Sequence, residues 1–110
     1  MIREGSIVTV HLVQPAEKFW GILYQVDPAG VIFRGISIDS FEDWLKELRQ
    51  GEEVGLGLAT IFVPLFRVER IYLDEPVGGV ESLGQRFARK IGISAEEYFG
   101  KAPSMGRLSV

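Results

Sequence analysis

The sequence predicts a mostly β domain with helical additions: a small antiparallel barrel of five short strands, one inserted helix and one C-terminal helix. Residues 6–38 form short apolar and β-branched runs that turns interrupt. Residues 40–50 carry helix-capping residues and one apolar stripe. After Pro64 the apolar alternation changes phase, which a tight turn between two further strands explains. We therefore expect a barrel over residues 1–76, and over 77–110 a helical appendage with a flexible tail in the same domain.

The composition is that of one folded domain. The chain has 110 residues, 46% of them hydrophobic and 25% charged, with a net charge of −3, which suits a single core. It contains no cysteine, so disulfides, thiolate metal sites and a cysteine nucleophile are excluded. The N-terminal residues do not resemble a signal peptide, and no apolar run approaches the ~20 residues of a membrane span. We expect a cytoplasmic protein without a membrane segment.

Runs of β-branched and aromatic residues predict the first three strands, at residues 6–13, 19–26 and 31–38. The second and third strands form a hairpin, because Asp27, Pro28 and Gly30 stand in the order typical of a turn. Gly21 interrupts the second strand, at a position where a strand bends sharply or another backbone approaches, and Gly35 is a second bend point, in the third strand.

A helix is predicted between strands three and four. Ser40 is the expected N-cap, and Gly51 is the expected residue after the C-terminus. One apolar stripe, which we interpret as core packing rather than a ligand site, comprises Phe41, Trp44, Leu45 and Leu48.

The fourth strand is predicted over residues 54–63 and ends at Pro64. Val68 and Ile71 could not share a face on one continuous strand, so a short helical turn over residues 65–68 must precede the fifth strand. Strand, tight turn and strand is typical of the end of an SH3-like barrel.

The last helix is predicted from Val80 to Ile91, with Leu83 and Phe87 on the same apolar line. Ser94 and Glu97 have the spacing of a capping box that starts a further short turn.

No constellation of residues identifies a reaction. The single histidine, His11, is expected on the solvated face of the first strand without a partner for catalysis or metal binding. Acidic residues occur as sequence neighbours, which point apart on strands and helices. We therefore expect no enzyme activity, no catalytic residue, no metal and no cofactor.

Two basic groups are candidates for binding an anion, because arginine grips carboxylates and phosphates. The candidate binding residues are Arg67 and Arg70 near the tight turn, and Arg86, Arg89 and Lys90 on the last helix. The alternative, which we favour, is that these residues form surface ion pairs and a solvated helix face. The residues expected to have structural roles are Gly21, Asp27, Gly30, Gly35 and Pro64.

Two segments resemble the halves of the Sm-like motif. Gly21–Asp27 has a Gly, then a Leu two residues later, an apolar residue and an Asp at the hairpin, and Phe62–Ile71 is similar to the second half. The resemblance covers about Val8–Leu73 and implies a five-stranded barrel that assembles into rings through its edge strands and often binds RNA. The base-binding Asn and the Arg-Gly pair of the family are absent, so a uridine pocket is not expected.

The leading hypothesis is a non-enzymatic Sm-like assembly or interaction module that forms a homo-oligomer. Its candidate edges, Thr60–Val63 and Ile71–Leu73, are apolar, and unpaired edges must be covered, charged or paired. The C-terminal helix could instead cover an edge within one chain. An Sm-like RNA-binding protein is the alternative, disfavoured by the acidic charge balance. A small-molecule-binding domain or enzyme, with a pocket between barrel and helices, is the second alternative.

Overall fold

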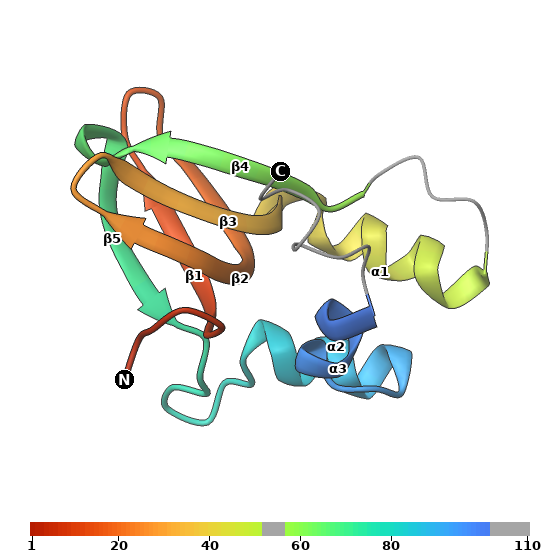
Figure 1. The fold of residues 1–110 in the computed structure, drawn as a ribbon. Helices are drawn as coiled ribbons and strands as arrows, with labels where there is room; N and C mark the ends of the chain where they lie inside the picture. The colour runs from red at the N-terminus through yellow and green to blue at the C-terminus, as the bar shows by residue number, and fades with distance from the viewer. Residues whose placement is uncertain (52–56, 102–110) are drawn as a thin grey trace.

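The computed structural model describes residues 1–51 and 57–101. Its strands are β1 (Ile7–Leu12), β2 (Glu17–Asp27), β3 (Gly30–Ser37), β4 (Ala59–Pro64) and β5 (Val68–Leu73). They form one antiparallel, five-stranded sheet in the order β4-β3-β2-β1-β5 (Figure 1). The mostly β class is thus confirmed. Because β4 and β5 are the two edges and do not pair with each other, the sheet is not closed into a barrel.

The inserted helix is confirmed as α1 (Phe41–Gln50), and Gly51 follows it in the left-handed conformation. The Ser40 side chain makes no capping hydrogen bond. Instead Ser37 accepts one from the Asp39 N–H, at the start of the 3-10 turn η1 (Ile38–Ser40). A second 3-10 turn, η2 (Leu65–Arg67), directly follows Pro64, as the change of phase predicts.

The C-terminal helices differ in detail from expectation. Helix α2 (Leu83–Ile91) begins three residues later than predicted, because Ser82 and Gln85 form a reciprocal capping box that fixes its start. Val80 is 69% exposed and exchanges backbone hydrogen bonds with Val77 in a tight loop. Ser94 caps α3 (Ala95–Lys101), as its spacing predicts. The flexible tail is predicted from Gly100 to Val110, but Gly100 and Lys101 belong to α3. The rest of the predicted tail, residues 102–110, and the predicted start of strand four lie outside the described residues.

Apolar side chains pack against both faces of the sheet, because the β2 sequence is apolar at consecutive positions. One face carries its own core: Val8, Val10, Leu12, Leu23, Val31, Phe33 and Val63. The other face presents Trp20 to the helices, where it packs against Phe41, Trp44 and Phe87. The helices therefore cover one end of the sheet and leave the corner near η2 uncovered (Figure 1).

The β2–β3 hairpin is built as predicted. Asp27 Oδ1 accepts hydrogen bonds from the backbone N–H groups of Ala29 (2.8 Å) and Gly30 (3.2 Å). These bonds, the one from Ala29 foremost, lower the pKa of Asp27. Gly21 lies directly opposite Gly35 in the ladder. Because β4 pairs with β3, the hairpin sets the position of β4 at the edge of the sheet.

Candidate functional site

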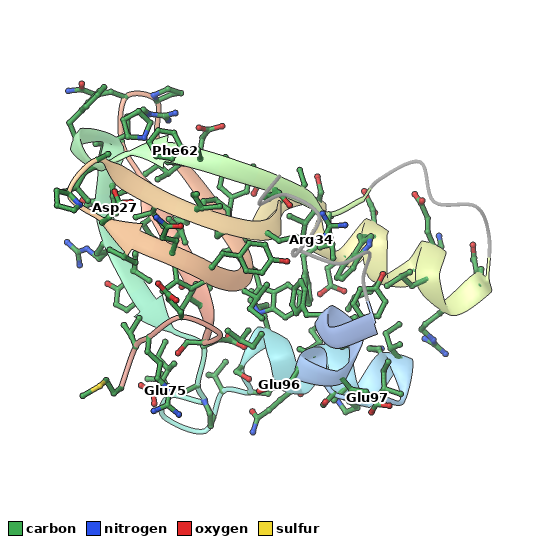
Figure 2. All side chains as sticks on the ribbon, in the orientation of Figure 1. Asp27, Arg34, Phe62, Glu75, Glu96 and Glu97 are labelled. Carbon is green, nitrogen blue, oxygen red and sulfur yellow. The ribbon has the colours of Figure 1, made fainter. Side chains whose placement is uncertain are left out.

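Exposed apolar side chains gather where the β2–β3 turn meets the end of β4. This corner cluster consists of Phe62, Leu65 and Phe66, which are 54%, 45% and 80% exposed. The Leu65 N–H donates to the Ala29 carbonyl (3.1 Å), which ties η2 to the turn. The Phe62 ring lies over Gly30, where an added Cβ would come within 2.8 Å of it. Figure 2 shows Phe62 beside the Asp27 turn. Clustered apolar exposure of this kind is typical of an interaction surface.

Among the residues that the structure describes, the backbone groups of β4 that have no partner in the ladder belong to Thr60 and Phe62. In an antiparallel ladder, hydrogen-bonded and non-hydrogen-bonded pairs alternate. The bond between Leu65 and Ala29 continues the β3–β4 register, so the odd-numbered residues of β4 bond to β3. Thr60 and Phe62 therefore point their N–H and C=O groups away from the sheet. Pro64 shares their phase, so its missing N–H removes no bond to β3.

The β5 edge differs from the β4 edge in shape and charge. Its register with β1 shifts between His11 and Leu12, which leaves Glu69 without an opposite residue. Arg70 lies 3.9 Å from the Glu69 carboxylate and donates to the Tyr72 hydroxyl (2.9 Å). A bulge and alternating charges are two devices that keep an edge strand from pairing with another chain. The β4 edge, Ala59–Pro64, has neither.

Arg67, a candidate for ligand binding, uses its guanidinium within the chain. Its Nε donates to the Val13 carbonyl (3.0 Å), and its Nη2 donates to the Pro15 carbonyl and to Glu17 (2.8 Å each). These bonds hold η2 against the loop between β1 and β2. Arg67 thus fixes the position of η2, which carries Leu65 and Phe66 of the corner cluster.

The basic face of α2 is divided between ion pairs and a cavity wall. Arg86 bridges to Glu42 on α1 (Nη2 to Oε1, 2.8 Å), and Arg89 pairs with Glu81 (2.6 Å). The hydrogen bond from Arg86 lowers the pKa of Glu42, and the one from Arg89 lowers the pKa of Glu81. Figure 1 shows α1 and α2 side by side at the end of the molecule away from η2.

Lys90, the third candidate on α2, lines an open cavity of about 600 Å³ together with residues of α1. Lys46 and Arg49 contribute further positive charge to its wall, and Glu42 and Asp43 contribute negative charge. Sequence analysis did not single out Lys46 or Arg49, because they lie on a different helix from Lys90. Their place on a helix face away from the buried stripe could be predicted from the helical spacing. The approach of α1 to α2 could not.

Asp74 is a residue whose role the sequence analysis missed. Its carboxylate accepts hydrogen bonds from the backbone N–H groups of Leu83 (3.2 Å) and Gly84 (2.7 Å), and from the Trp20 indole (3.2 Å). One side chain at the end of β5 therefore binds both the start of α2 and the centre of β2. An acidic residue between a strand and a helix start was the local signal, but the Trp20 contact is 54 residues away.

No group of three or more metal-ligating side chains occurs in the described ranges, 1–51 and 57–101. His11 packs edge-on against Tyr72, with ring centroids 4.9 Å apart. Burial lowers the pKa of His11, and the charge of Lys18 adds to this effect. The carboxyl groups with clearly shifted pKa values, Asp27, Glu42 and Glu81, are all shifted downward, towards the charged form.

No family model, no curated protein and no solved structure matches the chain. In the part of the chain that the structure describes, no helix is long and apolar enough to cross a membrane.

Proposed function

We propose that the protein is a non-enzymatic assembly module, an SH3-like or Sm-like small barrel that associates with copies of itself. The observation that carries the proposal is the β4 edge: its Thr60 and Phe62 backbone groups face outward, it bears no charge, and it adjoins the corner cluster. Unpaired donors and acceptors beside exposed apolar side chains form a ready surface for strand pairing. We also propose a cytoplasmic location, in keeping with the cysteine-free composition.

The arrangement of the edge strands supports the barrel. The turn η2 connects β4 directly to β5, so the two edges start from one corner of the sheet. The core of Val8, Leu23 and Phe33 fills the face between them. A sheet that holds its own core on one face and brings its two edges to one corner supports the proposal of a barrel with one open seam.

RNA binding is the second candidate function, and the cavity between α1 and α2 is the observation that favours it. Lys46, Arg49 and Lys90 line this cavity together, and clustered cations attract a phosphate backbone. Arg86 and Arg89 add little, because Glu42 and Glu81 neutralise them. The net charge of −3 also opposes RNA. A small-molecule site in the same cavity is the further alternative.

Sedimentation velocity at micromolar concentration tests the assembly proposal. We expect the protein to sediment as a homo-oligomer with closed symmetry, because open edges and exposed aromatic side chains are then covered. A monomer across the concentration range would contradict the proposal and would favour coverage of the edge within one chain.

A further inference from the structure

We infer that the β4 edge pairs with the β4 edge of a second copy, antiparallel and about a two-fold axis, to form a dimer. This inference rests on the proposed assembly function and specifies which surface carries it. The alternative within that function is a head-to-tail ring, in which the β4 edge of one copy pairs with the β5 edge of the next.

The contrast between the two edges favours the two-fold arrangement. Self-pairing sets the residues of one edge opposite residues of the same edge, which is destabilising where charges of one sign meet. The β4 edge, Ala59–Pro64, has no charged residue and is therefore compatible with itself. A head-to-tail contact would require the β5 edge, where Glu69 interrupts the register and Arg70 adds an exposed charge. β5 is thus the poorer partner for β4.

The free backbone groups select a register for this contact. Thr60 and Phe62 supply the outward N–H and C=O groups of β4. If Thr60 lies opposite Phe62 of the second copy, each of these groups meets a complementary one, and Ile61 lies on the axis. In the alternative register, Phe62 would lie opposite Phe62 of the second copy, and Thr60 opposite Pro64 of that copy. Because proline has no N–H, the Thr60 carbonyl would then lack a donor. We therefore expect the first register.

The corner cluster extends the same contact beyond the backbone. Phe62 projects from the edge strand itself, and Leu65 and Phe66 follow at its end. In the two-fold arrangement Phe62 packs over Thr60 of the second copy. An aromatic side chain set against a β-branched one is a favourable cross-strand pair.

A pair of matched variants tests the inference. Phe62→Lys places a charge in the proposed contact, and Tyr72→Lys makes the same change on the β5 edge, where Tyr72 is 44% exposed against 54% for Phe62. In sedimentation we expect a dimer for the unmodified protein and for Tyr72→Lys. For Phe62→Lys we expect at least a tenfold weaker self-association, with an unchanged circular dichroism spectrum.

The other outcomes overturn the inference in distinguishable ways. Loss of a larger oligomer in both variants would establish the head-to-tail ring, and the assembly function would stand. A monomeric unmodified protein would overturn the inference and the assembly function together.

Amide hydrogen exchange of the unmodified protein provides a measurement that no folding defect can obscure. In a dimer the Thr60 and Phe62 amides become more protected as the protein concentration rises, whereas the outward Ile71 amide of β5 does not. Protection of Thr60 and Phe62 that does not change with concentration would show that a segment of the same chain covers the edge, and would contradict the dimer.

Discussion

Gly21 and Gly35 lie opposite each other between β2 and β3, and neither position has room for a side chain. A Cβ at Gly21 would overlap the Arg34 carbonyl, and one at Gly35 would overlap the Trp20 carbonyl. The sequence indicated a bend or a close approach of another backbone at Gly21, and a bend at Gly35. The structure shows the close approach at both, between neighbouring strands that a side chain would force apart.

Gly35→Ala should therefore destabilise the fold strongly. The added methyl group meets backbone atoms of β2, which cannot move without shifting Trp20 in the core beneath the helices. Overpacking of this kind costs about 1–3 kcal/mol or more in the free energy of unfolding, which urea denaturation measures. Gly57→Ala is the matched control, because its Cβ meets nothing within 4 Å. Equal stability of the two variants would contradict the close approach.

The elements that the sequence predicted best are those whose signals are local. Helix α1 has its apolar stripe and Gly51 within a dozen positions, and η2 follows from the change of phase at Pro64. The start of α2 was predicted too early because Val80 continues an apolar line. Val80 instead lies in a loop that is closed by its backbone hydrogen bonds with Val77. Such bonds cannot be predicted from the spacing of apolar residues.

Contacts between distant elements could not be predicted from the sequence. The sequence of each strand does not show whether the two edges of the sheet meet. A closed barrel was therefore expected, whereas β4 and β5 do not pair with each other. The candidate binding residues were chosen by their charge and their place in the sequence. Their partners, Glu17 for Arg67 and Glu42 for Arg86, lie 50 and 44 residues away, and only the folded chain brings them together.

Asp74 joins two elements, and its removal should loosen the helices from the sheet. Asp74→Ala leaves the Trp20 indole and the first N–H groups of α2 without their acceptor. Leaving partly buried donors unpaired costs about 1–3 kcal/mol. We expect a loss of this size in urea unfolding, together with a change in tryptophan fluorescence. Glu75→Ala, at an exposed neighbouring position, should change stability by less than about 0.5 kcal/mol. Similar losses in both variants would contradict the role of Asp74.

At the scale of the whole molecule, the basic wall of the cavity and the exposed apolar cluster lie at different places. The helices carry the ion pairs of Arg86 and Arg89 and the basic wall of the cavity between α1 and α2. The corner cluster and the Phe62 end of β4 lie near η2, away from these charges (Figure 1). Self-association at the corner would therefore leave the basic wall accessible, so the two candidate functions can be measured separately.

RNA should bind weakly and without preference for uridine. Three cations that line the cavity, Lys46, Arg49 and Lys90, are the expected contacts. Release of counterions from about three phosphates gives a log–log salt slope of about −2 for single strands. Fluorescence anisotropy with labelled oligouridine and oligoadenosine should show similar, salt-sensitive binding that the combined Lys46→Ala, Arg49→Ala and Lys90→Ala substitutions weaken further. Arg70→Ala, which removes an exposed cation on β5, is the control and should leave binding unchanged. Submicromolar, salt-tolerant affinity for oligouridine would contradict this prediction and would make RNA binding the leading function, because electrostatic attraction alone neither resists salt nor distinguishes one base from another.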